Sequence, residues 1–148
     1  MTLSLATLPH PTAWLASGFG LYVRDHGTVR MTPRFPRSGP YGFWIGGTFF
    51  GRVQLKVDGR PLESERRQLE WSGQYIPFGT TRLGAGRHTV TISYRSDGIT
   101  PGVVGEAPLP LGPLAVAADV TPRLLNVPRS RAQTLCGRRL DWVEALRR

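Results

Sequence analysis

The sequence predicts an all-β domain, a jelly-roll-like antiparallel β-sandwich with little or no helix. Short runs in which apolar and polar residues alternate recur along the chain, and Gly, Pro, Asp and Ser separate these runs. Helical periodicity is nearly absent. Because 148 residues suffice for one core, we expect a single sandwich domain over residues 1–148. Within it, residues 1–26 form either an N-terminal extension or the first strand.

The expected strands are short, rich in β-forming residues and bounded by turn residues or proline. In chain order they cover residues 27–32, 41–50, 52–57, 75–81, 88–94, 111–117, 124–127 and 135–146. Pro33 and Pro128 end the first and the seventh of them, because proline has no amide hydrogen to donate to a neighbouring strand. The last segment fits a strand or a short helix, and we favour the strand.

The clearest local prediction is a hairpin at Asp58-Gly59. Residues 52–57 alternate Val and Leu with Arg, Gln and Lys, as in a strand with one buried face. The Asp-Gly dipeptide supplies the positive φ angles of a tight two-residue turn, and residues 60–62 begin the returning strand. Residues 88–94 alternate in the same way and predict a second strong strand.

The long connection over residues 96–109 contains five Gly and Pro residues and predicts a surface loop. Loops of this kind often carry binding residues. Glu63, Glu65 and Glu70, interrupted by Arg66 and Arg67, predict another solvated and charge-balanced connection instead of a hydrolytic pair of carboxylates.

The formal charge of +9 comes from eighteen Arg and one Lys. These residues are scattered singly among acids, which favours a solvated surface over a specific nucleic-acid interface. Electrostatic binding to nucleic acid or anionic lipid would require the arginines to converge on one face.

Several functional classes lack their sequence signals. There is no phosphate-binding glycine loop, no pair of His at metal spacing and no Ser in a nucleophile elbow, so we expect no enzyme and no cofactor. Cys136 is the only cysteine, and we expect a buried, unreactive thiol. Asp141 and Glu144 are candidate oxygen ligands for a structural calcium, but the sequence does not gather the six or more oxygens that calcium takes. No apolar run reaches the length of a membrane span and no basic leader begins the chain, so we expect this chain to be soluble.

The segment 66–78 has the composition of a sugar-binding site. A sugar offers an apolar C–H face and a rim of hydroxyls, which suit an aromatic platform with planar polar partners. Trp71 and Tyr75 are the expected platforms. The expected hydrogen-bonding residues around them are Arg67, Gln68, Gln74 and Asp97.

The alternative for these aromatic residues is burial in the core, which would favour a structural or protein-interaction module over a carbohydrate-binding domain. Phe43 and Trp44 are stronger candidates for burial. Because neighbouring residues of a strand face opposite sides of the sheet, one of these two should face the core. Trp142 is also most simply explained as a core residue.

The order of these segments resembles the galactose-binding-domain-like jelly rolls, a superfamily with many carbohydrate-binding modules. The matching segments are PYGFWIGGTFFGRVQLKVDGR, LGAGRHTVTISY and RLDWVEAL, within residues 27–146. Together with RRQLEWSGQYIPFGTTRLGAG and LCGRRLDWVEAL, the chain is also similar to soluble domains of actinobacterial membrane glycosyltransferases. The resemblance implies a non-catalytic domain on the extracytoplasmic face of the cell envelope, with envelope glycans as ligands and a membrane glycosyltransferase as parent or partner. Only Asp25 lies where many relatives carry carboxylates for calcium, which argues against calcium-dependent recognition.

Overall fold

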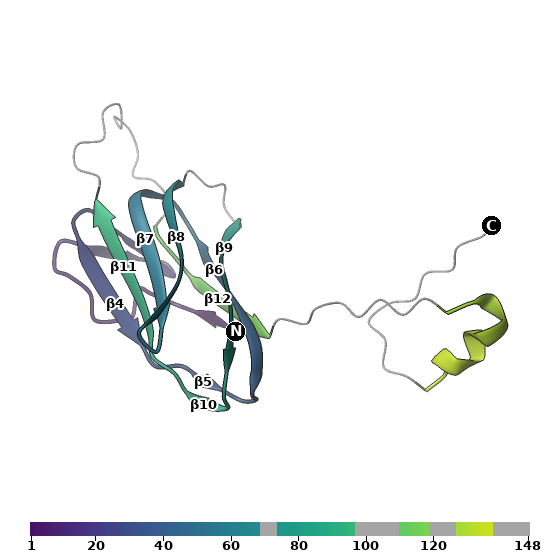
Figure 1. Ribbon diagram of the computed structural model, residues 1–148. Helices are drawn as coiled ribbons and strands as arrows, with labels where there is room; N and C mark the ends of the chain where they lie inside the picture. Colours follow the sequence, from purple (N-terminus) through teal and green to yellow (C-terminus); the bar gives the residue numbers. More distant parts are fainter. Residues whose placement is uncertain (69–73, 97–109, 119–126, 138–148) are drawn as a thin grey trace.

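The protein folds as a β-sandwich. The computed structural model describes residues 1–68, 74–96, 110–118 and 127–137, with only the backbone described for residues 66–68 and 129. The described part of the chain contains two four-stranded sheets, and every strand pairing is antiparallel (Figure 1). The predicted all-β, jelly-roll-like fold is therefore confirmed.

The two sheets are each made of strands that are distant in the sequence. The first sheet has the order β1 (Thr2–Leu3), β12 (Leu114–Ala118), β6 (Gly39–Gly46) and β9 (Tyr75–Leu83). The second has the order β4 (Gly27–Met31), β11 (Val90–Ser96), β7 (Phe49–Val57) and β8 (Arg60–Gln68). Two small ribbons pair β2 (Leu15–Ser17) with β3 (Gly20–Tyr22) and β5 (Arg34–Phe35) with β10 (Gly86–Arg87). The helix of the described residues is the 3₁₀ helix η1 (Arg129–Leu135).

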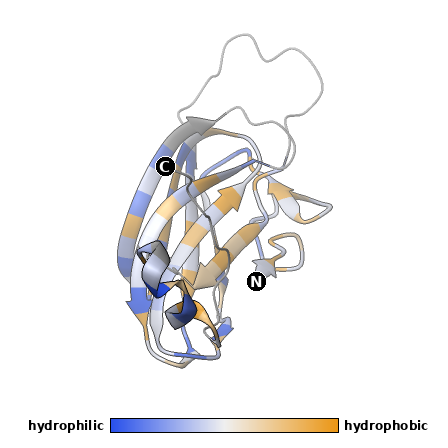
Figure 2. Cartoon of the chain, turned by 90° about the vertical axis from the view of Figure 1, so that its right-hand side faces the viewer, coloured by the Kyte–Doolittle hydropathy of each residue, from blue (hydrophilic) through white to orange (hydrophobic). Residues whose placement is uncertain are grey.

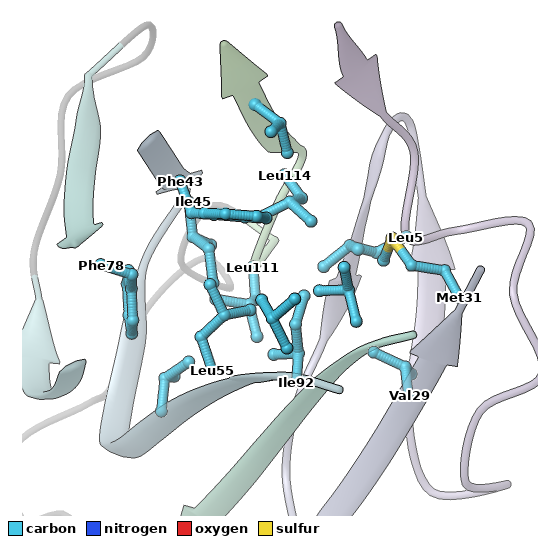
Figure 3. Packing of buried hydrophobic residues seen from close by; sticks show 14 of the residues in the cluster. Leu5, Val29, Met31, Phe43, Ile45, Leu55, Phe78, Ile92, Leu111 and Leu114 are labelled. Atoms are coloured by element: carbon cyan, nitrogen blue, oxygen red, sulfur yellow. The ribbon is translucent and has the colours of Figure 1, made fainter. Parts of the chain in front are cut away.

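One apolar cluster fills the space between the sheets. Phe43 and Ile45 of the first sheet and Leu55 and Ile92 of the second are fully buried in it (Figure 3). Figure 2 shows the alternation that produces this core, with hydrophobic and hydrophilic segments following each other along the strands. Each fully buried side chain of this size contributes about 1.5–3 kcal/mol to folding, so the alternation fixes which face of each strand is inside.

The predicted Asp58-Gly59 hairpin is present between β7 and β8. Val57 pairs with Arg60, and the two intervening residues have φ angles of 49° and 78°. Positive φ at both central positions is the mark of a type I′ turn, whose twist matches that of the flanking strands.

The N-terminal segment, residues 1–26, is part of the sandwich. It supplies β1, β2 and β3, and its Leu5, Trp14 and Leu21 are buried in the main core. The indole N–H of Trp14 donates a hydrogen bond to the carbonyl oxygen of Asp25 at 3.0 Å. Trp14 is therefore a buried residue whose polar atom has a hydrogen-bond partner, and it packs this segment against the start of β4.

The structure corrects the sequence prediction that the acidic segment around Glu63 and Glu65 is a connection. These residues lie in β8, a strand of nine residues, and not in a connection. β8 is the last strand of the second sheet, and an edge strand accommodates charged side chains because one side of it remains open to solvent.

The C-terminal predictions were partly wrong. Leu135 is the last residue of η1, so no strand begins there, and Val127 belongs to no strand. Cys136 is exposed and not buried, because it lies in the turn directly after η1. Residues 124–126 and 138–148, with Asp141, Trp142 and Glu144, lie outside the described residues.

Candidate functional site

The outer face of the first sheet is organised by β6. Phe43 and Ile45 of this strand are fully buried, so Gly42, Trp44 and Gly46 point to the opposite side. The prediction that one of Phe43 and Trp44 faces the core is confirmed, and Phe43 is the buried residue. Trp44 is half-buried on the outer face.

The indole ring of Trp44 lies across Gly42, two residues earlier on the same face. A Cβ on Gly42 would lie 2.9 Å from Cζ3 and 3.0 Å from Cζ2 of Trp44, and closer still to its Cη2. These distances are shorter than van der Waals contact. Because Gly42 has no side chain, the indole ring of Trp44 can lie directly against the backbone of β6.

Tyr75 lies on the same face, at the far end of β6. It is the first residue of β9 and pairs with Gly46. A Cβ on Gly46 would lie 3.3 Å from Cε1 of Tyr75, so this ring also lies beside a glycine of β6. Tyr75 is 41% exposed, and Gln74, directly before it, is exposed too. The two aromatic residues are thus held by the same pair of strands.

The residues in register with Trp44 and Gly42 have small side chains. On β12 and β9, the residues in register with Trp44 and Gly42 are Ala115, Pro77, Ala117 and Thr80. β9 has one extra residue between Pro77 and Thr80, and Gly79 in this bulge has φ 94°. The bulge lets Phe78 enter the core while Thr80 stays on the outer face.

The polar atoms of the buried and the outer aromatic residues differ. Tyr41 and Tyr94 donate their hydroxyls to carbonyl oxygens of Arg37 and Phe50. Within the described part of the chain, no hydrogen bond is made by the indole N–H of Trp44 or by the hydroxyl of Tyr75. The two outer residues therefore keep a polar group for an external partner beside an accessible ring.

We call this surface the aromatic face: Gly42, Trp44, Gly46, Pro77, Tyr75, Ala115 and Ala117. Its rings can pack against the C–H face of a sugar, and the free N–H and hydroxyl can bond to sugar hydroxyls. Exposed hydroxyls stand at its margin, from Thr80 on β9 and from Thr2, which pairs with Ala115. This combination is the one that the sequence predicted for a sugar site, on a different set of residues.

Two of the six predicted site residues are fully described, and both border the aromatic face. These are Tyr75 and Gln74. Arg67 and Gln68 lie in β8 with undescribed side chains, and Trp71 and Asp97 lie outside the described residues. Trp44 was missed, although the alternation of β6 and the glycines at positions 42 and 46 carried the signal.

The strongest electrostatic interaction of the described residues is at the β7–β8 turn. Nδ1 of His88 donates to Oδ2 of Asp58 at 2.6 Å, and its Nε2 donates to the carbonyl oxygen of Gly84 at 3.0 Å. The hydrogen bond to the carboxylate raises the pKa of His88, and the bond from His88, followed by that from the amide of Thr89, lowers the pKa of Asp58. Because both ring nitrogens face acceptors, this geometry favours the imidazolium form of His88 in an ion pair with Asp58.

The described residues contain no group of three or more His, Cys, Asp or Glu side chains that could hold a metal ion. No helix within these residues has the length and apolarity to cross a membrane.

Comparison with known proteins gives structural but not sequence relatives. No protein-family model matches the sequence, and no curated protein is similar enough to count as a relative. Among solved structures, the chain resembles part of the Podospora anserina GH26-CBM35 β-(1,4)-mannanase, with a TM-score of 0.55 and 11% identity over 84% of this chain. A Paenibacillus xanthan lyase gives a TM-score of 0.52 and 14% identity over 79% of this chain. A cycloisomaltooligosaccharide glucanotransferase from Paenibacillus sp., solved with cycloisomaltoheptaose, gives a TM-score of 0.51 and 15% identity over 77% of this chain.

These likenesses establish the fold. The matched parts amount to 28%, 13% and 18% of the three larger chains, so this chain spans a minor fraction of each. At such identities a shared sandwich is shown, and function has to be argued from the site.

Proposed function

We propose that this protein is a non-catalytic carbohydrate-binding domain and that it binds through the aromatic face. One observation carries the proposal: Trp44 and Tyr75 each lie beside a glycine of β6 on the outer face, with an accessible ring and a polar group that has no partner among the described residues. Rings that served only the core would be buried with satisfied polar atoms, as Trp14 and Tyr41 are.

The dimensions of the face suit an oligosaccharide. Gly42 and Gly46 are four residues apart on one strand, which corresponds to about 13 Å along the sheet. This length accommodates more than one sugar ring. Small neighbours such as Ala115 and Ala117 let the ligand approach both aromatic rings, and Gln74 and Thr80 are placed to bond to its hydroxyls.

The structural neighbours support the ligand class. The mannanase carries CBM35 in its name, and the glucanotransferase was solved with a cyclic oligosaccharide. The sequence resemblance to domains of membrane glycosyltransferases extends the proposal to glycans of the cell envelope, on its extracytoplasmic side. This domain would then hold the acceptor glycan near a parent or partner glycosyltransferase.

The remaining predicted contacts belong to the same proposal. Trp71, Arg67, Gln68 and Asp97 are the further ligand-binding residues that it includes. We expect Trp71→Ala to weaken sugar binding while the free energy of unfolding is preserved. Unfolding of that variant would instead make Trp71 a core residue.

The proposal is tested by isothermal titration with a panel of neutral oligosaccharides based on mannose, galactose, arabinose and glucose, with and without calcium. For any ligand found, Trp44→Ala and Tyr75→Ala should each raise Kd about tenfold or more, as truncation of a central aromatic contact does.

Phe19→Ala is the matched control for these variants. Phe19 is an exposed aromatic residue, 69% accessible, at the β2–β3 turn and outside the aromatic face. It should leave Kd unchanged. Equal losses for all three variants, or no saturable binding to any glycan of the panel, would exclude the aromatic face as the site.

The alternative, a structural or protein-interaction module, would be favoured by an exposed apolar patch over several strands with every aromatic residue between Arg66 and Phe78 buried. Phe78 is fully buried, but the exposed fraction of Tyr75, 41%, does not meet that condition.

A further inference from the structure

The outer face of the second sheet gathers the positive charge that looked scattered in the sequence. In β4, β11 and β7 the core residues alternate with outward residues, and four of the outward residues are cationic. They are Arg30, Arg52, Lys56 and Arg95. Figure 1 shows these strands side by side, in the order that the pairing gives. We call this surface the cationic face.

The four cations form two rows across the sheet. Arg52 pairs directly with Arg95, and the backbone of Arg66 continues that row on β8. Arg30 and Lys56 both pair with Thr91 and flank it from either side. The rows are four residues apart along β11, which corresponds to about 13 Å.

Uncharged polar residues fill the space between the rows. Thr28, Ser93 and Gln54 lie in register across the three strands, and the hydroxyls of Thr28 and Ser93 are 3.1 Å apart. The surface is therefore flat, cationic at both ends and hydrogen-bonding in the middle.

No carboxylate of the described residues neutralises this face. None of the four acids of that part of the chain lies on β4, β7 or β11. Asp58 is bound to His88, Glu63 lies beside Gly79 of the first sheet, Glu65 pairs with the inward-facing Val53, and Asp25 precedes β4. None of the four cations of the face has an ion pair or a side-chain hydrogen bond with a described residue.

The direct pairing of Arg52 with Arg95 is itself informative. Like charges opposite each other on one face of a sheet destabilise it. Such a pair contributes nothing to folding that neutral residues would not provide, whereas two guanidinium groups side by side are well suited to carboxylates.

We propose that the cationic face binds an acidic polysaccharide, a chain whose sugar units carry carboxylates. Carboxylates would meet the two cationic rows, and sugar hydroxyls would meet the row of Thr28, Ser93 and Gln54. The inference does not depend on the aromatic face, which lies on the other sheet.

Other polyanions fit this surface less well. The strongly exposed large hydrophobic residues of the described chain are Met1, Leu15, Phe19 and Tyr75, and none lies on β4, β7 or β11. Phe50, two residues before Arg52 on the outward side of β7, is half-buried. Among the described residues, a membrane surface would therefore find no strongly exposed apolar anchor there, and single-stranded nucleic acid only one partly covered ring. A flat sheet also offers no element that enters a duplex groove.

The test compares binding of polygalacturonate with binding of the same polysaccharide in its methyl-esterified, uncharged form. Titration at low and at high ionic strength should show binding of the acid form only, weakened by salt. The double variant Arg52→Gln/Arg95→Gln should raise Kd about tenfold, as expected when two surface ion contacts are lost.

A charge-matched control separates this face from the overall charge. Arg37→Gln/Arg82→Gln removes two exposed arginines, one between β5 and β6 and one on β9, and both double variants have a formal charge of +7 instead of +9. This control should change Kd less than about twofold, within the usual effect of remote surface charges. Arg52→Gln/Arg95→Gln should leave Kd for a neutral oligosaccharide unchanged, because both arginines lie on the other sheet, so failure of the aromatic face and failure of the cationic face are distinguishable.

Three outcomes would overturn the proposal. They are equal losses in the two charge-matched double variants, equal binding of the esterified polysaccharide, and tighter binding per charge to phosphatidylglycerol vesicles or duplex DNA than to polygalacturonate. The last result would assign the face to a membrane or a nucleic acid.

Discussion

The two outer faces of the sandwich have the same backbone architecture and opposite chemistry. The first sheet presents Trp44 and Tyr75 among Gly, Ala and Pro, whereas the second presents Arg30, Arg52 and Arg95 among Thr, Ser and Gln. Their inner faces are alike, because both contribute apolar residues to one core. The difference therefore does not arise from the demands of folding, which are satisfied on the inside.

This contrast indicates that the solvent-facing positions of the strands are the ones that can differ according to the ligand. A solvent-facing position of a strand tolerates many residues at a cost of a few tenths of a kcal/mol. An aromatic ring over a glycine on one sheet, and arginines on the other that no described carboxylate neutralises, are both unnecessary for stability. We infer from this that the two faces serve two kinds of ligand surface.

The largest expected effect is on the free energy of unfolding, and it distinguishes a buried residue of β6 from its outward-facing neighbour. Phe43→Ala should lower the free energy of unfolding by about 3–5 kcal/mol, because it empties a fully buried site. Trp44→Ala, one residue further on, should cost less than half as much, since its ring is half-buried on the outer face. Urea unfolding followed by circular dichroism measures both. Similar losses for the two variants would show that Trp44 is a core residue.

The next effect concerns the glycine beneath the indole ring. Gly42 has no positive φ angle, so alanine fits its backbone, but the added Cβ would collide with the ring of Trp44. Gly42→Ala should displace the ring and raise Kd for a neutral oligosaccharide about tenfold, or roughly 1.4 kcal/mol. Polygalacturonate binding should not change. Gly84→Ala, at a position with open space around it, is the control.

Sequence periodicity was sufficient for the fold. The alternation in residues 52–57 and 88–94 and the Asp58-Gly59 turn predicted β7, β11 and the hairpin, since these signals are local. The sequence predicts only the start of β8, at residues 60–62, and an extension or a first strand over residues 1–26. The residues of both segments are charged or irregularly spaced, and their conformation is determined by pairing with strands distant in the sequence.

The candidate site was predictable only in part for a similar reason. Tyr75 stood out because Arg67, Gln68 and Gln74 precede it in the sequence, but Trp44 sits in an apolar run that resembles core. Its outward direction follows from strand alternation once Phe43 is known to be inside. The convergence of Arg30, Arg52, Lys56 and Arg95 depends on the register of three strands, which no local pattern in the sequence specifies.

A smaller effect is expected from the ion pair that closes the β7–β8 turn. The raised pKa of His88 stabilises the fold at pH values below its ordinary pKa of 6.5, and this contribution is lost as pH rises through the higher folded value. The lowered pKa of Asp58 stabilises the fold above its ordinary pKa of 3.8, and this contribution is lost as pH falls through the lower folded value. Stability from the pair is therefore greatest between these two ordinary values.

Asp58→Asn tests this pH dependence, because it retains an acceptor for the amide of Thr89 and a good turn residue but removes the charge. Between about pH 5 and pH 8 the native protein should lose a further ~0.2–1 kcal/mol of unfolding free energy relative to the variant, a value limited by the exposure of the pair. Identical pH profiles in urea unfolding would show that the pair contributes nothing. Neither double arginine variant should alter the difference.

The smallest effect has the opposite sign and bears directly on the cationic face. Arg52→Gln/Arg95→Gln removes a like-charge pair in direct register, so it should raise the free energy of unfolding by a few tenths of a kcal/mol at low ionic strength. Added salt should abolish the gain by screening the repulsion in the native protein. The control Arg37→Gln/Arg82→Gln should show a smaller gain or none, because Arg37 lies outside the strands and Arg82 pairs with the uncharged Pro40. A double variant that is more stable but binds polygalacturonate less tightly would mean that the two arginines are maintained for the ligand at the expense of the fold.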